Sequence, residues 1–199
     1  MSRDIELLFP SPIQISMVEN AAAMNPGLLK AVEAIRAATP NGRPESWMST
    51  VYTTLNTADQ LHQAPEFAGL AEIILVEVRA FADALGINHQ DYPLRFMDCW
   101  FNIYGPKDGQ ESHIHPNSVI SGSYYLKAPE GCSGIMFHAP MGDTMFVPPL
   151  REINALNTQG AEMPVREGAL VLFRSWLKHS VRPSPATDER ISISFNLMM

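Results

Sequence analysis

The sequence has 199 residues, of which 46% are hydrophobic and 18% charged, a composition that excludes a largely disordered chain. Its net charge of −7 excludes the basic surface of a general nucleic-acid-binding protein, so we expect no nucleic-acid partner. No apolar run is long enough to span a membrane, and the N-terminus lacks the form of a signal peptide. Cys99 and Cys132 form no spaced framework, which favours a reduced, cytoplasmic protein.

The first half of the chain is expected to be helical. Asn25 and Pro26 are residue types that favour a helix N-cap and first helical position, and they predict a helix over 26–38. A second helix is predicted over 65–85, because apolar residues recur there at helical spacing and Gly86 can end it. We expect both helices to pack outside a sheet.

The second half has short β-rich runs and turn-rich connections, which are typical of a sandwich or barrel. It lacks the regular alternation of strand and helix that marks a parallel α/β fold. We therefore predict a mainly β fold with N-terminal helices, in which a jelly roll is buttressed by helices. Residues 1–199 are expected to form one domain, mostly helical over 1–93 and with its β core over 94–199. The predicted strands are 95–104, 119–127, 134–138, 169–173 and 190–197.

Two of the six histidines, His113 and His115, stand two residues apart. On a strand such residues project from the same face, so both imidazoles can reach one metal ion. The pair alone is a weak signal, because six histidines in a chain of this length give roughly 0.15 such pairs by chance. Two surface histidines before a Pro-Asn turn would give the same pattern.

The last predicted strand alternates strictly between apolar and polar residues. Its polar face is either the wet side of an edge strand or the lining of an anion site. Arg190 favours the second interpretation, because a guanidinium pairs with a carboxylate in bidentate fashion and Ser192 can add a hydrogen bond. The apolar face has Ile191, Ile193, Phe195 and Leu197, and the polar face has Arg190, Ser192, Ser194 and Asn196.

A third histidine, His179, follows the strand predicted at 169–173 and precedes Arg190 by eleven residues. The order His-x-His, distal His, Arg-x-Ser resembles the 2-oxoglutarate/Fe(II) oxygenase superfamily, and more closely its small bacterial and phage members of unassigned substrate. The segment 167–181 is also similar to part of the aspartyl/asparaginyl hydroxylases. The resemblance covers at least 102–197, and it lies in the motifs His113-Ile-His115-Pro-Asn-Ser, Ser121-Gly122, Tyr124-Tyr125-Leu126, Gly168, Phe173, Ser175-Trp176-Leu177, His179, Val181 and Glu189-Arg190-Ile-Ser192-Ile-Ser194-Phe195-Asn196.

The resemblance implies a double-stranded β-helix with Fe(II) at its mouth, held by His113, His115 and His179. It implies 2-oxoglutarate and O₂ as co-substrates, with Arg190 and Ser192 binding the 5-carboxylate of 2-oxoglutarate. Oxidative decarboxylation of 2-oxoglutarate would be coupled to oxidation, and most simply hydroxylation, of a substrate. Further residues for contacts with the co-substrate or the substrate are Asn102, Tyr104, Ser123 and Tyr125.

The chain departs from the superfamily at His115, where a carboxylate is usual. A neutral third imidazole makes the metal site more positive than the usual carboxylate would. Three arrangements are open: three histidine ligands, two histidines with water, or ligation by His115 with His113 outside. We favour three histidines because imidazole suits iron; Asp108 and Glu111 are alternative carboxylates. A halogenase is disfavoured, since it needs the ligand position that His115 fills.

Other classes share parts of this pattern. A cupin-type metal enzyme that does not use 2-oxoglutarate would have Glu a few residues after the histidine pair, where this chain has Val119 and Ile120. A zinc hydrolase of the metallo-β-lactamase type continues the pair with Asp-His, whereas 116–118 read Pro-Asn-Ser. A non-catalytic jelly roll that binds a carboxylate or sugar would carry incidental histidines. The substrate, a small molecule or a protein side chain, is left open, and a homodimer is the commonest assembly.

Overall fold

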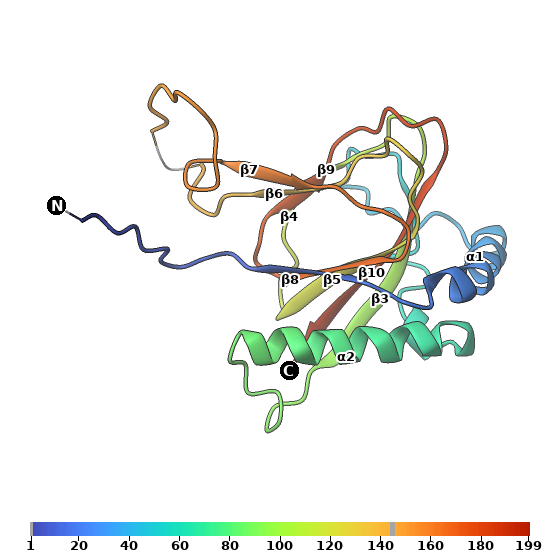
Figure 1. The fold of residues 1–199 in the computed structure, drawn as a ribbon. Helices are drawn as coiled ribbons and strands as arrows, with labels where there is room; N and C mark the ends of the chain where they lie inside the picture. Colours follow the sequence, from blue (N-terminus) through green and yellow to red (C-terminus); the bar gives the residue numbers. More distant parts are fainter. Residues whose placement is uncertain (1, 144–145) are drawn as a thin grey trace.

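The computed structural model describes residues 2–143 and 146–199, and they form two antiparallel sheets that face each other (Figure 1). The larger sheet contains β1 (Ile13–Met17), β2 (Tyr52–Thr53), β3 (Arg95–Tyr104), β5 (Ile120–Lys127), β8 (Ala169–Arg174) and β10 (Arg190–Met198). The smaller sheet contains β4 (Gln110–His113), β6 (Ile135–His138), β7 (Gly160–Met163) and β9 (His179–Val181). Their strand orders are β1-β8-β5-β10-β3-β2 and β4-β9-β6-β7.

All five predicted strands are confirmed, each within one residue at either end. The strands that were not predicted, β1, β2, β4, β7 and β9, each have five residues or fewer. Three of these, β4, β7 and β9, belong to the smaller sheet, and none has more than four residues. Alternation cannot be recognised over so few positions.

The helices α1 (Ala21–Ala38) and α2 (Ala68–Ala84) pack on the outer side of the larger sheet, as predicted (Figure 1). Short 3₁₀ turns at Leu61–Gln63 and Pro65–Phe67 lead into α2. The predicted end of α2 is confirmed: Gly86 has a φ of +66° and donates to Asp83 O at 3.0 Å, and Ile87 donates to Ala82 O at 2.9 Å. These two bonds form a Schellman motif.

The predicted start of the first helix is wrong. Helix α1 begins at Ala21, five residues before Pro26, which therefore lies inside the helix. Asn20 is the N-cap residue of α1, and its carbonyl accepts hydrogen bonds from the N–H groups of Ala23 and Met24, both at 3.1 Å. Asn25 does not cap the helix. It is buried and bonds to the sheet instead, so tertiary contacts overrode the local capping signal.

Two apolar cores hold the fold together. The first lies between the helices and the outer face of the larger sheet, and it includes Val32, Val78 and Phe195. The second lies between the two sheets and includes Phe137 and Phe173. Strand β10 is central in the larger sheet, between β5 and β3, so its polar face is not the wet side of an edge strand.

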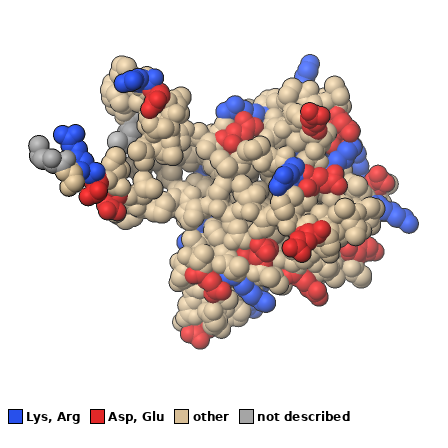
Figure 2. Space-filling model, in the orientation of Figure 1, with Lys and Arg blue, Asp and Glu red and all other residues tan. Residues whose placement is uncertain are grey.

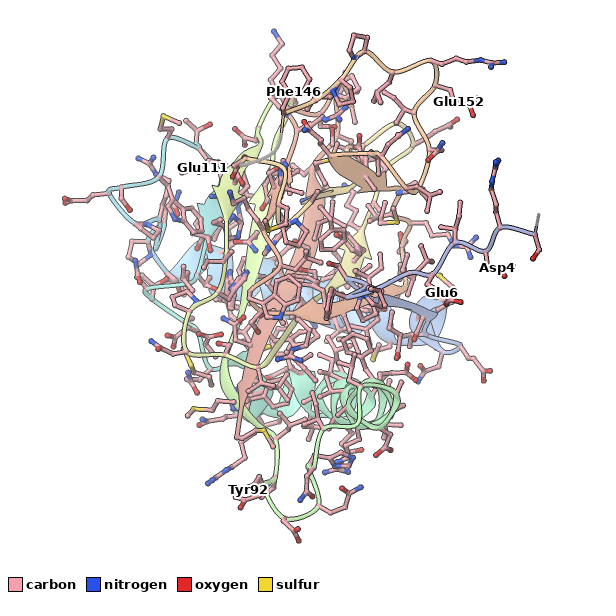
Figure 3. All side chains as sticks on the ribbon, turned by 90° about the vertical axis from the view of Figure 1, so that its left-hand side faces the viewer. Asp4, Glu6, Tyr92, Glu111, Phe146 and Glu152 are labelled. Atoms are coloured by element: carbon pink, nitrogen blue, oxygen red, sulfur yellow. The ribbon has the colours of Figure 1, made fainter. Side chains whose placement is uncertain are left out.

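The segments outside these cores extend into solvent. The N-terminal arm carries Asp4 and Glu6 away from the sheets, and the loop after β6 carries Phe146 and Glu152 (Figure 3). On the face shown in Figure 2, Lys and Arg side chains are scattered among Asp and Glu and form no stripe. None of the described helices has the length and apolarity that crossing a bilayer would need.

Asn25 connects α1 to the sheet, and its replacement should destabilise the protein. Its amide donates to Leu126 O at 3.3 Å and to Glu167 Oε1 at 3.1 Å, and it accepts from the Tyr124 hydroxyl at 2.6 Å. Asn25→Ala leaves the buried Tyr124 hydroxyl without an acceptor. We expect urea unfolding to show a loss of about 2–3 kcal/mol.

Asn20→Ala is the matched control in the same helix, because the exposed Asn20 side chain makes no capping bond. It should change stability by less than about 0.5 kcal/mol. Equal losses in the two variants would show that Asn25 does not connect helix and sheet.

Candidate metal centre and its cavity

Three histidines meet at one point between the sheets. His113 ends β4 and His179 begins β9, and the two residues are cross-strand partners. His115 lies two residues beyond the end of β4, where its backbone N–H donates to Ser175 O at 3.0 Å. One ring nitrogen from each histidine lies within 4.8 Å of the others. His113 and His115 therefore do not lie on one strand face as predicted. His113 is the last residue of β4 and His115 lies in the segment after it, yet their rings still approach each other.

The backbone fixes two of the rings so that Nε2 can bind a metal. His113 Nδ1 donates to Glu111 O at 2.8 Å, and His179 Nδ1 donates to Leu177 O at 2.9 Å. With the proton on Nδ1, the lone pair lies on Nε2. The Nε2 atoms of His115 and His179 are 3.2 Å apart. Two nitrogen ligands, each about 2.1 Å from one ion, lie about 3 Å apart, so this spacing fits shared ligation.

The electrostatics keep these rings neutral. Burial, together with charge on the neighbouring histidines, lowers the pKa of His115 to about 3 and that of His179 to about 2. Burial also lowers the pKa of His113. Because a metal ligand must be deprotonated, histidines held neutral at physiological pH bind metal without first releasing a proton to solvent.

A cavity of about 370 Å³ adjoins the triad and extends along the inner face of the larger sheet. Arg190 lines one end and is only 3% exposed. Its Nη1 donates to Ser133 O at 2.7 Å, while its Nε has no partner among the described residues. The guanidinium carbon lies 4.2 Å from the centre of the Tyr104 ring and 5.6 Å from that of Tyr125.

The acidic residues that could have paired with Arg190 are engaged elsewhere. Glu189 pairs with Arg36 at 3.0 Å, and Asp188 pairs with Lys127 at 2.9 Å. The third, Glu167, accepts a hydrogen bond from Asn25. Arg190 is therefore a buried cation that forms no ion pair within the part of the chain that the structure describes.

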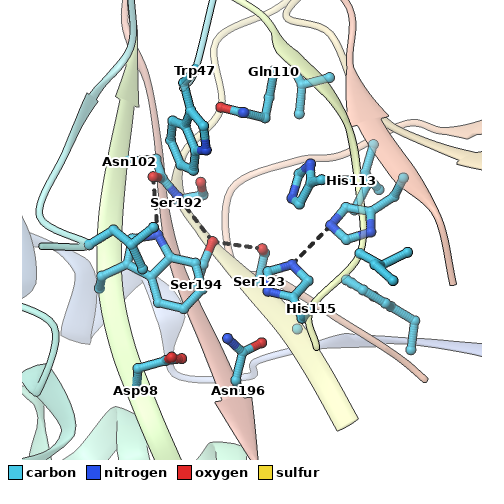
Figure 4. A pocket seen from close by; sticks show the side chains of 18 of the residues that line it. Trp47, Asp98, Asn102, Gln110, His113, His115, Ser123, Ser192, Ser194 and Asn196 are labelled. Carbon is cyan, nitrogen blue, oxygen red and sulfur yellow. Dashed lines mark hydrogen bonds between the residues drawn. The ribbon is translucent and has the colours of Figure 1, made fainter. Parts of the chain in front are cut away.

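The other predicted contact residues, Ser192, Asn102, Tyr104, Ser123 and Tyr125, all line the same cavity. Two of them belong to a polar network on its floor (Figure 4). Asn102 accepts from Trp100 Nε1 at 3.2 Å and donates to Ser194 Oγ at 3.1 Å, and Ser194 lies 3.0 Å from Ser123 Oγ. These bonds fix the floor of the cavity.

The alternative ligands proposed from the sequence lie outside the triad. Asp108 Oδ2 accepts from the N–H of Gly105 at 2.9 Å, and Glu111 Oε1 accepts from that of Met48 at 2.9 Å. Within the described residues, the group that could hold the ion contains only the three histidines. His138 lies outside the triad and bonds to Ser180 Oγ at 2.9 Å.

Sequence reasoning missed Gln110 and Asp98, which both line the cavity (Figure 4). Gln110 is 5% exposed, and neither of its amide atoms has a partner among the described residues. It lies on β4, a strand too short to predict. Asp98 could have been found, because it lies on β3 with the same parity as Asn102 and Tyr104 and so faces the same way.

Asp98 is a poorly solvated carboxyl group. Burial and, to a smaller extent, the charge of Asp59 raise its pKa, hydrogen bonds from Asn196 lower it, and the resulting pKa is about 6. One of its oxygens, Oδ1, is buried without a hydrogen-bond partner in the described part of the chain. The cavity therefore ends in an unpaired cation at Arg190 and a partly unpaired carboxyl group at Asp98.

A model of the family described as "Putative 2OG-Fe(II) oxygenase" matches residues 98–196. This stretch contains the three histidines, Gln110 and Arg190. Among curated proteins, none matches the sequence.

Solved structures share the fold. A prolyl-4-hydroxylase from Pseudomonas putida is 17% identical with a TM-score of 0.61, and the match covers 94% of this chain and 92% of that one. HygX from Streptomyces hygroscopicus, solved with nickel, 2-oxoglutarate and hygromycin B, is 16% identical with a TM-score of 0.62. The match covers 94% of this chain and 83% of HygX. A prolyl hydroxylase from Trichoplax adhaerens, in complex with a peptide fragment of hypoxia inducible factor, is 13% identical with a TM-score of 0.62. The match covers 94% of this chain and 83% of the Trichoplax enzyme. These likenesses confirm the predicted jelly roll.

The Asp98 carboxyl group should destabilise the metal-free protein in a pH-dependent way. Below about pH 4 the group is protonated in both the folded and the unfolded chain, so its ionisation does not lower the free energy of unfolding. As pH rises from about 4 to 6, the unfolded chain releases the proton first, because the folded pKa is about 6 and the usual value is 3.8. Asp98→Asn should therefore raise the unfolding temperature at about pH 8, and this gain should vanish near about pH 4.

The control is Asp91→Asn, in the exposed loop after α2, which should give no pH-dependent gain. Thermal melts followed by circular dichroism at the two pH values measure the difference. A gain of equal size at both would show that ionisation of Asp98 is not its cause.

Proposed function

We propose that this chain, which belongs to the 2OG-Fe(II) oxygenase family, couples the oxidative decarboxylation of 2-oxoglutarate to the hydroxylation of an organic substrate. Arg190 is the observation that carries the proposal. A buried guanidinium with an unused donor stands at one end of a cavity that also contains three convergent histidines. Within the jelly-roll architecture, this combination favours a 2-oxoglutarate enzyme over a cupin or a sugar-binding module.

We assign His113, His115 and His179 as the residues that would hold Fe(II). Their neutral state, the inward Nε2 atoms and the 3.2 Å spacing between two of these atoms support the assignment. When bound, Fe(II) would supply the activation of O₂, which no side chain can perform. Glu111 and Leu177 act through their carbonyls, because these set the tautomers and ring orientations of two ligands.

The 5-carboxylate of 2-oxoglutarate would bind at Arg190. A buried carboxylate requires a charged partner and several hydrogen bonds. The free Nε of Arg190 supplies a donor, and Ser192 shares the same strand face. Gln110 Nε2 is a further unused donor in this cavity. Tyr104 and Tyr125 shield the guanidinium from water, which strengthens the pairing.

The neighbouring structures suggest two substrate classes. HygX is solved with hygromycin B and the Trichoplax enzyme with a peptide. For this chain we propose a small molecule or a protein side chain. We also propose one domain over 1–199, a cytoplasmic location supported by the free thiols of Cys99 and Cys132, and a homodimer. The scattered charges in Figure 2 support the expectation of no nucleic-acid partner.

Removal of a ligand histidine should abolish metal binding. His113→Ala and His179→Ala should each weaken Fe(II) binding by at least about a hundredfold, more than the loss of a supporting residue around a metal site. His138→Ala is the matched control, because His138 bonds to Ser180 and does not line the cavity. Anaerobic titration followed by metal analysis of the desalted protein measures the effect.

The same titration decides between the arrangements open at His115. Three histidine ligands predict that His115→Ala loses binding as the other two variants do, whereas His115→Asp retains it as a carboxylate triad. Binding by His115→Ala at the wild-type affinity would instead indicate two histidines with water.

Arg190→Ala should weaken 2-oxoglutarate binding at least about tenfold, because a charge-assisted bond contributes about 1.5–3 kcal/mol and 1.4 kcal/mol is one decade. Iron binding should persist. Arg190→Lys should recover only part of the affinity, since an ammonium group cannot reproduce the guanidinium fork. Arg36→Ala, which removes an exposed arginine paired with Glu189, is the control. Unchanged affinity in Arg190→Ala under anaerobic Fe(II) would refute the assignment.

A further inference from the structure

The two ends of the cavity carry opposite charge. In the pairing of β10 with β3, Arg190 lies opposite Tyr104 and Asn196 lies opposite Asp98. The two ends of this strand pair are six residue steps apart, about 20 Å along an extended chain. The triad adjoins the middle of the pair, where the Trp100 ring lies 6.0 Å from that of His115. A ligand bound at Arg190 therefore leaves the Asp98 end for a second molecule.

At the Asp98 end one carboxylate oxygen is left without a partner. Asn196, which is 4% exposed, holds the carboxyl group through hydrogen bonds, and its own Oδ1 accepts from Ser121 Oγ at 2.7 Å. The second oxygen, Asp98 Oδ1, is buried and unpaired in the described residues. No ion pair of the described residues includes Asp98, and Asp59 adds negative charge nearby.

Apolar side chains line part of the cavity, among them Met97 and Trp100, which are close to Asp98 along β3. They suit a short aliphatic chain, which gains free energy on leaving water. A carboxylate removed from water needs a charged donor, and none of the ion pairs among the described residues supplies one to Asp98. Among the described residues, Asp98 belongs to no group of three or more side chains that could hold a metal ion. The apolar residues that line the cavity include Leu55, Met97, Trp100, Ile114 and Pro116.

We infer that Asp98 and Asn196 form the subsite for the primary substrate, and that this substrate is an organic cation whose protonated amine or guanidine pairs with Asp98 Oδ1 beside a short aliphatic chain. The inference rests on the proposed function, in which 2-oxoglutarate occupies the Arg190 end. It narrows the substrate class to amines and guanidines, free or as Lys and Arg side chains. Charge complementarity at both ends would then keep the two ligands in opposite halves of the cavity.

Four probes of similar size test the inference: butylguanidine, butylamine, 1-butanol and butyrate. They are titrated anaerobically into the full chain loaded with Fe(II) and 2-oxoglutarate, and binding is followed by calorimetry and by the fluorescence of the tryptophans that line the cavity. We expect the two cations to bind at least about tenfold more tightly than butanol or butyrate. The selectivity of the wild-type protein is a test that requires no variant to fold.

Asp98→Asn is the isosteric variant. It should lower the affinity for both cations at least about tenfold and leave 2-oxoglutarate affinity within about twofold. Asp91→Asn, an exposed change outside the cavity, should alter neither. Wild-type protein that binds 2-oxoglutarate but does not prefer the cations would overturn the inference and leave the proposed function standing. Undiminished cation binding in Asp98→Asn would overturn it equally. Failure of wild-type protein to bind 2-oxoglutarate would instead refute the proposed function.

Discussion

The constraint on which this structure depends is the burial of β10 on both of its faces. The strand is central in the larger sheet, and its first eight residues are all buried. One face packs Ile193 and Phe195 against the helices, as an ordinary core does. The other face carries Arg190 and Asn196, whose polar atoms cannot be left without partners at low cost. The inner face is therefore stable only if neighbouring side chains or a bound ligand satisfy it.

The chain satisfies the middle of that face and leaves the ends open. In the middle, Asn102, Ser194 and Ser123 bond to one another and need nothing further. At the ends, Arg190 Nε and Asp98 Oδ1 are buried without partners in the described residues. Unsatisfied buried groups are costly, and they are expected where a ligand supplies the missing bonds. The distribution of satisfied and unsatisfied atoms thus divides the cavity into a fixed floor and two binding ends.

The sequence predicted the features that repeat along a strand and missed those that depend on single contacts. The longer strands of the larger sheet, β3, β5, β8 and β10, were predictable because each is a β-rich run bounded by turn residues. Glycine fits at position 122 of β5 because a Cβ there would lie 2.6 Å from Val171 O. Three of the four strands of the smaller sheet, β4, β7 and β9, were not predictable, since they are too short to show a period. Gln110 was missed for that reason. The helix start at Asn25 was wrong because distant partners, Leu126 and Tyr124, use the side chain that local rules assign to a cap.

The position of His115 follows from the same network that holds the acidic end. The N–H of His115 is bound by the carbonyl of Ser175, whose hydroxyl lies 2.8 Å from Ser121 Oγ. Since Ser121 donates to Asn196, Ser175 must donate to Ser121, and the chain of bonds continues from Asn196 to Asp98. Buried hydroxyls thus connect His115, the proposed third ligand, to Asp98 and Asn196, the proposed substrate subsite. In the proposed enzyme, such a connection keeps the inferred cation at a fixed distance from the histidines, which is what selective oxidation of one carbon requires.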